Sequence, residues 1–460
     1  MKKSLILGLL PAALVMTGCM SLAPTLESSK NIVPTEFTTT GIYANNEVGE
    51  IKQEDLLWSS YVKHDNLKEI ISQALEHNKD LRIASANIEA AKAQYGISQM
   101  DRLPMINGDL LGTKTRGVNG ISENYQASLG LSSFEIDAFG RVKNLSDAAL
   151  NSFLSTNEAK KVTGLSVISE TAKAYFNIAL AKSQLDIAKK TKRATEESLE
   201  IMKLRVEHGI STAKDQKDLE SIYYLAQSDL LNYETQVEKS INALRFLVGD
   251  ELNLSLLPET IYELKNSIAD LKIQVNSEIL FNRPDVLSAE YQLRSANANI
   301  GAARAAFFPR ISLTTNAGVV SGELSSLFSS DNLRTWSFVP SIHIPIFDIA
   351  KNKANLKISE AQKEKMIATY EKTAQQAYRE VNDELARKST INNQINFFTK
   401  HVQANRDRLD LANKTYEAGV QGYLSVLTAR TDLYSAEKSA LSLEKERFNN
   451  LIDLYKVIGY

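Results

Sequence analysis

The chain has 460 residues, of which 43% are hydrophobic, and a formal net charge of −2 at pH 7. A nucleic-acid-binding protein normally carries a basic patch or stripe, so this charge balance argues against nucleic acid as a partner. The hydrophobic content allows a large buried surface. No uncharged stretch after the N-terminus is long enough for a transmembrane helix.

Residues 1–18 are predicted to be a lipoprotein signal peptide. Lys2 and Lys3 give a positively charged start, and the apolar run LILGLLPAALVM follows them. The run ends in MTGC, which resembles the lipobox of bacterial lipoproteins, where the cysteine becomes the acylated first residue. Cys19 is the only cysteine, so it has no internal disulfide to form. We therefore expect lipid attachment at Cys19, and Met20 after it favours the outer membrane; the alternative is an ordinary secretory signal with an incidental cysteine.

Residues 19–57 are predicted to form a lipid-anchored extended tether. Their sequence begins SLAPTLESSKNIVPTEFTTTG after Met20 and is rich in Ser, Thr and Pro. Segments of this composition bury little apolar surface, so we expect the tether to have little core of its own. The folded part is expected to begin near Trp58.

The rest of the chain repeats one plan twice. Gly209 matches Gly419 at an offset of 210 positions (419 − 209), and the match continues without a gap to the end of the chain. Further upstream, Pro104 matches Pro309 at an offset of 205 positions (309 − 104). Self-similarity over such a distance indicates a duplicated structural unit.

Each repeat is predicted to contain a short helix, two strands and a long helical hairpin. The first repeat spans residues 58–257 and the second spans 283–460, with 258–282 as a connector between them. The short helices are expected at about Asn66 to Met100 and Asp285 to Ala306, and each ends before a proline.

Alternating apolar and polar residues predict four strands, two in each repeat. Period-two alternation indicates a strand with one apolar face. The three clear segments are YQASLGLS from Tyr125, ISLTTNAGV from Ile311 and WSFVPSIHIPI from Trp336, and a weaker one follows Pro104. His343 falls on the polar face of the last segment, so we expect it to line a lumen rather than to bind a metal.

Two very long helices are predicted, one in each repeat. The stretches Arg141 to His208 and Lys351 to Ala418 contain no proline and no other convincing breaker. A helix of that length spans roughly 100 Å, so such helices have to pack side by side. Gly209 and Gly419 would end them and let the chain turn back, because glycine adopts positive φ without a steric penalty.

Four strands in one chain cannot close a barrel. Open sheet edges cannot face lipid, because their unpaired backbone groups would stay unsatisfied. The strands are nevertheless long enough to cross an outer membrane. The pattern therefore predicts that closure requires several copies of the chain.

The chain resembles the TolC-like outer-membrane efflux factors, in particular the lipoprotein branch that serves resistance–nodulation–division drug pumps. The most specific part of the resemblance is a signature that begins with Arg283, Pro284 and Asp285 and runs through Pro309. The segments that carry it are NRPDVLSAEYQLRSANANIGAARAAFFPRISL, SFEIDAFGRVKN, WSFVPSIHIPIFD and YEAGVQGYLSVLTARTDLYSAE.

This resemblance implies a mainly α-helical fold with a membrane β-barrel. The chain would form a homotrimer in which a twelve-stranded β-barrel continues into a twelve-helix periplasmic α-barrel, and the connector 258–282 would belong to an equatorial collar. The implied function is the outer-membrane exit duct of a tripartite multidrug efflux pump. Its partners would be an inner-membrane resistance–nodulation–division pump and a periplasmic adaptor.

The adaptor is expected to dock on the two hairpin tips. The residues at these tips are Gly209 and Ile210 in the first repeat and Gly419 and Val420 in the second. Glycine is also what a helix end requires, so a capping role accounts for the two glycines equally well.

The gate of the duct is predicted from a departure from the family. Close relatives carry two acidic residues after the second tip, where this chain has Ser425 and Thr428. At the repeat offset these positions correspond to Asp215 and Asp218, so an anionic ring could have moved to the first hairpin. The alternative is that both aspartates only stabilise a helix start, since Thr212 and Asp215 have capping-box spacing.

Other functions were weighed against the duct. The five histidines are scattered, and no nucleophile turn, phosphate loop or metal-ligand spacing occurs. We therefore expect no enzyme activity, no cofactor and no metal site. The remaining alternatives are a duct for secreted proteins or metal ions and a non-conducting structural lipoprotein.

Overall fold

The computed structural model describes residues 21–26, 32–37, 57–118, 120–270, 276–329 and 333–459. The predicted signal peptide and Cys19 lie outside the described residues. The chain divides into two compact units, the first formed by residues 1–32, 86–159 and 285–373 and the second by residues 33–85, 160–284 and 374–460. Both units draw on both repeats of the sequence.

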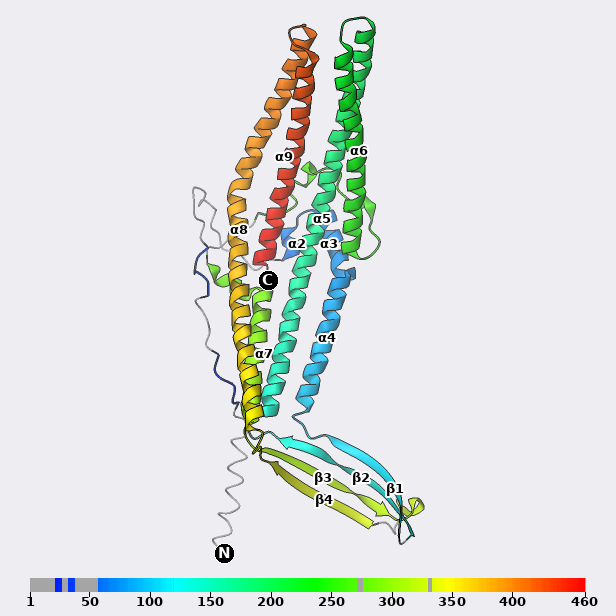
Figure 1. Ribbon diagram of the computed structural model, residues 1–460, viewed down its shortest axis with the longest axis vertical. Coiled ribbons are helices and arrows are strands. Elements are labelled where there is room, and N and C mark those ends of the chain that lie inside the picture. Colours follow the sequence, from blue (N-terminus) through cyan, green and yellow to red (C-terminus); the bar gives the residue numbers. More distant parts are fainter. Residues whose placement is uncertain are drawn as a thin grey trace. The chain divides into compact units, whose positions relative to one another are not determined.

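The described chain is mainly helical (Figure 1). Its α-helices are α2 (Trp58–Tyr61), α3 (Asp65–His77), α4 (Lys79–Met100), α5 (Arg141–Glu207), α6 (Ala213–Val248), α7 (Pro284–Ala305), α8 (Ile349–Glu417) and α9 (Tyr423–Ile458). Its strands are β1 (Ile106–Gly117), β2 (Gly120–Ile136), β3 (Arg310–Ser321) and β4 (Leu333–His343). The same succession of elements, one helix followed by two strands and two long helices, occurs twice, first from α4 to α6 and then from α7 to α9. None of the described helices combines the length and the apolar character of a membrane span.

The first unit contains a four-stranded antiparallel sheet. The strands lie in the order β1-β2-β3-β4, as Figure 1 shows. Pro104 and Pro309 lie just before β1 and β3, where a missing backbone N–H does not interrupt the sheet. Within this unit Phe139 stacks on Phe308 beside the start of β3, with ring centroids 4.6 Å apart.

The second unit contains α6, α9 and the parts of α5 and α8 from residues 160 and 374 onward, which form two helical hairpins, α5 with α6 and α8 with α9 (Figure 1). Its core is aromatic where α5 meets α9, because Phe176 stacks on Phe448 at 4.2 Å between ring centroids. The small helix α2 is held against α9 by Tyr61, whose hydroxyl donates to the Leu451 carbonyl at 2.5 Å and whose ring stacks on Tyr455.

The predicted helix from Asn66 to Met100 is two helices, α3 and α4, separated at Asn78. The backbone of Asn78 has ψ 133°, which ends α3. Its side-chain oxygen accepts hydrogen bonds from the N–H groups of Asp80 and Leu81, so it starts α4. Asn is a common N-cap residue, and this signal in the sequence was missed.

The predicted tether contacts the folded body at two places, although it has little core of its own. In the first unit the Asn297 side chain donates to the Pro24 carbonyl at 2.7 Å. In the second unit Val33 and Phe37 are buried, and Phe37 stacks on Tyr378. The backbone N–H of Ser277 donates to Thr35 at 3.0 Å. An extended segment without its own core is thus ordered by hydrogen bonds and by two buried side chains.

Candidate functional site: the sheet faces and the hairpin tips

The sheet has one apolar face, and that face is exposed. Paired residues of antiparallel strands lie on the same face of a sheet. Leu129 of β2 pairs with Gly108 of β1 and with Ala317 of β3, and Ala317 in turn pairs with Trp336 of β4. The same face includes Ile106, Leu110, Ala127, Leu131, Leu313, Val319, Phe338 and Ile342. Leu129 is 64% exposed and Trp336 is 80% exposed. A contiguous exposed apolar surface marks contact with lipid or with another protein.

The opposite face of the sheet is polar, and two glycines bring β2 and β3 together there. A Cβ on Gly130 would lie 2.1 Å from the Thr315 carbonyl oxygen, and a Cβ on Gly318 would lie 2.2 Å from that of Ala127. Only glycine allows this close approach of the two strand backbones. His343, the last residue of β4, lies on this polar face as predicted.

A β-bulge keeps the apolar face continuous along β2. The pairing with β3 skips one position between Leu131 and Phe134, and Ser133 has φ 51°. The extra residue returns Phe134 to the face of Leu131 although their numbers differ by three (134 − 131). The predicted alternation is thus confirmed within β2, β3 and β4. It fails for Ile344 and Ile346, which follow the end of β4.

The first hairpin tip is a Schellman-type helix end. Gly209 has φ 69° and its N–H donates to Val206 at 3.0 Å, while the N–H of Ile210 donates to Arg205 at 2.8 Å. This pattern satisfies carbonyls that the end of α5 would otherwise leave free. The hydrophobic residue after such a glycine often packs back onto the helix, but Ile210 is 71% exposed.

The second tip repeats this geometry. Gly419 has φ 72° and donates to Tyr416 at 3.0 Å, and Val420 donates to Thr415 at 2.9 Å. Val420 is 74% exposed. Each tip therefore presents one β-branched apolar side chain to solvent from a rigid turn.

The predicted gate aspartates lie in the first turns of α6. Thr212 and Asp215 form a capping box, because the Asp215 N–H donates to the Thr212 hydroxyl and the Thr212 N–H donates to the Asp215 carboxylate, each at 3.2 Å. Asp218 pairs with Lys214 at 3.0 Å. Both aspartates thus have local partners, which is what the capping interpretation expects.

Ser425 and Thr428 bond to their own helix. The Ser425 hydroxyl donates to the Gly422 carbonyl at 2.8 Å, and the Thr428 hydroxyl donates to that of Leu424 at 2.9 Å. They line an open groove of about 810 Å³ between α8 and α9, with Arg408 and Leu411 on its other side. The groove contains no carboxylate.

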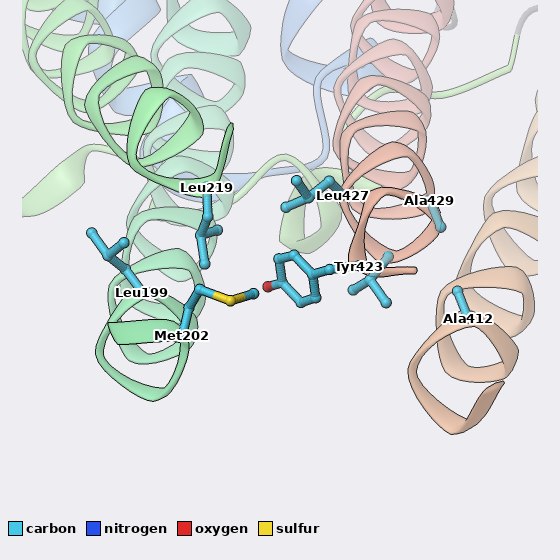
Figure 2. Packing of buried hydrophobic residues seen from close by; sticks show 8 residues of the cluster. Leu199, Met202, Leu219, Ala412, Tyr423, Leu427 and Ala429 are labelled. Atoms are coloured by element: carbon cyan, nitrogen blue, oxygen red, sulfur yellow. The ribbon is translucent and has the colours of Figure 1, made fainter. Parts of the chain in front are cut away.

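A buried cluster joins the two hairpins near their tips (Figure 2). Its members are Leu199 and Met202 from α5, Leu219 from α6, Ala412 from α8, and Tyr423, Val426, Leu427 and Ala429 from α9. In Figure 2 the Tyr423 ring points toward Met202. Arg205 adds a cation–π contact, with its guanidinium carbon 4.9 Å from the Tyr416 ring centroid. The tips are therefore held together by side chains from all four helices.

The family signature fixes the start of the second repeat. Arg283 is 7% exposed, and its guanidinium donates to the Val457 carbonyl at 2.8 Å and to the Glu380 carboxylate at 3.0 Å. A cation at the last turn of α9 also complements the helix dipole. Pro284 is the first residue of α7, a position that needs no N–H donor. The Asp285 carboxylate accepts from the next backbone N–H.

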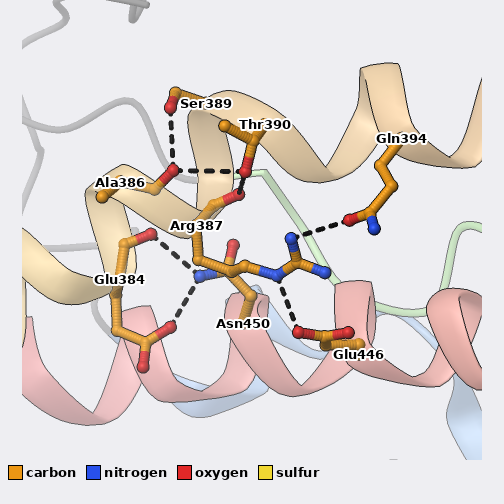
Figure 3. A network of polar contacts seen from close by, with 8 residues as sticks. All are labelled: Glu384, Ala386, Arg387, Ser389, Thr390, Gln394, Glu446 and Asn450. Atoms are coloured by element: carbon orange, nitrogen blue, oxygen red, sulfur yellow. Dashed lines mark hydrogen bonds and ion pairs between the residues drawn. The ribbon is translucent and has the colours of Figure 1, made fainter. Parts of the chain in front are cut away.

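A polar network between α8 and α9 was not predicted (Figure 3). Arg387 pairs with Glu446 at 2.8 Å and donates to Gln394. Asn450 donates to both the backbone carbonyl and the carboxylate of Glu384. The only signal in the sequence is polar residues at helical spacing, which is equally typical of a solvated face.

Comparisons with known proteins agree over most of the chain. A family model described as "Outer membrane efflux protein" matches residues 70–250 and 275–460. The "Cation efflux system protein CusC" of Escherichia coli (strain K12) is 35% identical over 451 residues, which cover 97% of each chain. The "Solvent efflux pump outer membrane protein SrpC" of Pseudomonas putida is 34% identical over 460 residues, covering 97% of this chain and 96% of the relative. The structure of the open state of the Neisseria gonorrhoeae MtrE outer membrane channel has a TM-score of 0.85 and 32% identity, covering 96% of this chain and 98% of the other.

Proposed function

We propose that this chain, which belongs to the outer membrane efflux protein family, is the outer-membrane exit duct of a tripartite efflux pump. The duct conducts drugs and other toxic small molecules passively to the exterior. The observation that carries this proposal is the sheet, which exposes an apolar face on one side and has a polar face on the other. Such a sheet suits a barrel wall between lipid and water.

The duct is a homotrimer in this proposal. The sheet order leaves the outer edges of β1 and β4 without a strand partner among the described residues. Three copies of four strands would close a twelve-stranded barrel and satisfy these edges. The hairpins would likewise form a twelve-helix periplasmic barrel, with the connector 258–282 in an equatorial collar.

The tips dock a periplasmic adaptor, which in turn joins an inner-membrane resistance–nodulation–division pump. The exposed Ile210 and Val420 support this, because each tip offers an apolar anchor on a fixed turn. Ile210→Trp with Val420→Trp should abolish efflux and adaptor cross-linking while trimers stay intact. The conservative pair Ile210→Val and Val420→Ile is the control and should retain both. Normal efflux and cross-linking in the tryptophan variant would rule out the tips as the docking surface.

Asp215 and Asp218 form an anionic ring at the periplasmic opening in addition to their local bonds. Three copies of each would gather negative charge at one constriction. Gln at position 215 keeps capping-box chemistry without charge, so Asp215→Gln with Asp218→Asn separates the two roles. We expect this variant to show higher bilayer conductance or weaker block by cations. Thr212→Ala, which removes the cap and keeps the charges, should leave cation block unchanged. If Asp215→Gln with Asp218→Asn left conductance and cation block unchanged while Thr212→Ala altered them, the aspartates would act only as helix caps.

The mature chain is anchored through acylated Cys19 in the outer membrane, with its helices in the periplasm. The support is the lipobox-like MTGC and the absence of a second cysteine. Cys19→Ser should stop incorporation of radiolabelled lipid, and persistent labelling would contradict the anchor.

The test of the whole proposal is conduction. Detergent-extracted trimers should conduct ions in a planar bilayer, which a structural lipoprotein would not do. Deleting the gene should increase susceptibility to dyes, detergents and antibiotics. Salts of transition-metal cations belong in the same panel, because the relatives named above include both a cation and a solvent efflux protein. Sensitivity to the metal salts alone would assign a cation cargo.

A further inference from the structure

The apolar face of the sheet ends in a charged zone at the β1–β2 hairpin. Along β2 this face is apolar from Ile136 to Tyr125. That length is roughly 35 Å along the strand, and a strand tilted as in outer-membrane barrels would then cover the roughly 25 Å apolar band of such barrels. The next positions on the same face toward the hairpin lie outside that band.

Basic residues predominate in this zone. On β1 the face continues from Gly112 to Lys114 and Arg116. On β4 it continues from Trp336 to Arg334, which pairs with Val319 and is therefore in register with Ala127, near the end of the apolar stretch. All three basic side chains are exposed. The single acidic residue of the face, Glu123, pairs with Lys114.

Arg116 and Arg334 are the charged residues of this zone that have no ion-pair partner among the described residues. Within the part of the chain that the structure describes, no carboxylate lies within ion-pair distance of Arg116 or Arg334. A guanidinium facing lipid is costly at the middle of the bilayer and costs little at its edge. At the edge it can reach headgroups while its alkyl stem covers apolar surface. A planar guanidinium also binds phosphate through two parallel hydrogen bonds.

We propose that Arg116 and Arg334 bind the phosphate groups of lipopolysaccharide in the outer leaflet. This inference rests on the proposed function, because it needs the barrel to span the outer membrane with its hairpins outward. The arginines lie on β1 and β4, the two edges of the sheet. Closure of the trimer would bring β4 of one copy beside β1 of the next, so the two arginines would lie on adjacent strands at each junction and each could bind a lipid phosphate there.

The test measures lipid binding to purified trimers by native mass spectrometry. The probes are lipid A with both phosphates and lipid A from which both have been removed. The variant Arg116→Gln with Arg334→Gln should bind the phosphorylated lipid more weakly by at least about tenfold, because it removes the charge-assisted hydrogen bonds of both guanidinium groups. Its binding of the dephosphorylated lipid should equal that of the unaltered protein.

Arg310→Gln is the matched control, because it removes the same charge from the polar face of the same sheet. It should bind both lipids as the unaltered protein does. Unchanged binding in the double variant, or equal binding of both lipids by the unaltered protein, would overturn the inference. Bilayer conductance of the same trimers tests the proposed function separately, since a conducting trimer that ignores lipid phosphate refutes only the lipid site.

Discussion

The Glu384 carboxyl shows how the fold acts on a single residue. Its partial burial beside α9 raises its pKa above the ordinary value. The hydrogen bond from Asn450 lowers the pKa, and the nearby Asp453 carboxylate raises it again. The folded protein therefore binds this proton more tightly than the unfolded chain does. The contribution of Glu384 to stability is greatest at low pH and is lost as the pH rises above the ordinary carboxyl range.

Glu384→Gln should raise the thermal unfolding temperature at about pH 8 and have no effect near pH 4, because it removes the charge whose burial is unfavourable. The glutamine oxygen can still accept from Asn450. Thermal unfolding of the purified protein in detergent over this pH range measures the effect. Glu364→Gln, at an exposed position of the same helix, should show no such pH dependence. A shift that is the same at every pH would contradict the prediction.

At the scale of the element, the hairpin tips depend on backbone conformation. Gly419 has φ 72°, while Gly422 three residues later has φ −72° and is the N-cap of α9. An L-residue at the first position is strained, whereas one at the second is not. The repeat shows this directly, because Thr212 occupies in the first tip the position that Gly422 occupies in the second.

Gly419→Ala should destabilise the second tip by about 1–2 kcal/mol, the cost of a left-handed conformation for a residue with a Cβ. Gly422→Thr should be neutral or slightly stabilising, because a hydroxyl can cap α9 as Thr212 caps α6. Hydrogen exchange of the amides in the last turn of α8 reports local opening. Equal exchange in the two variants would show that φ at Gly419 does not control the tip.

At the scale of the whole molecule, the sheet decides whether the chain can enter a membrane. Phe338 lies on the apolar face and its neighbour Ser337 on the polar face. Phe338→Arg should therefore cost about 2–4 kcal/mol per copy on insertion, as for arginine facing lipid near the bilayer midplane. Ser337→Arg should be tolerated, because its side chain lies on the polar face, which would line the lumen of the proposed barrel.

The measurement is the amount of protein in the outer-membrane fraction, together with the bilayer conductance of the protein that is recovered. Loss of Phe338→Arg with normal amounts of Ser337→Arg is the expected pattern. Equal insertion of both would mean that the apolar face does not contact lipid.

The sequence by itself determined the parts of this protein that depend on local interactions. The two long helices follow from the absence of breakers, and α5 and α8 end within two residues of the predicted limits. The strands follow from period-two alternation, and the tips follow from glycines at positive φ. Each of these signals lies within a few residues of the structure it specifies, so it can be recognised without a partner segment.

Only the tertiary structure decided which residues of distant segments contact one another. Arg283 bonds to Val457, which is 174 residues away, and Phe37 stacks on a helix that begins more than 300 residues later. The Arg387–Glu446 pair depends on which faces of α8 and α9 meet. The sequence marks such residues as polar or aromatic but not as partners, because a contact between distant segments depends on the packing of both.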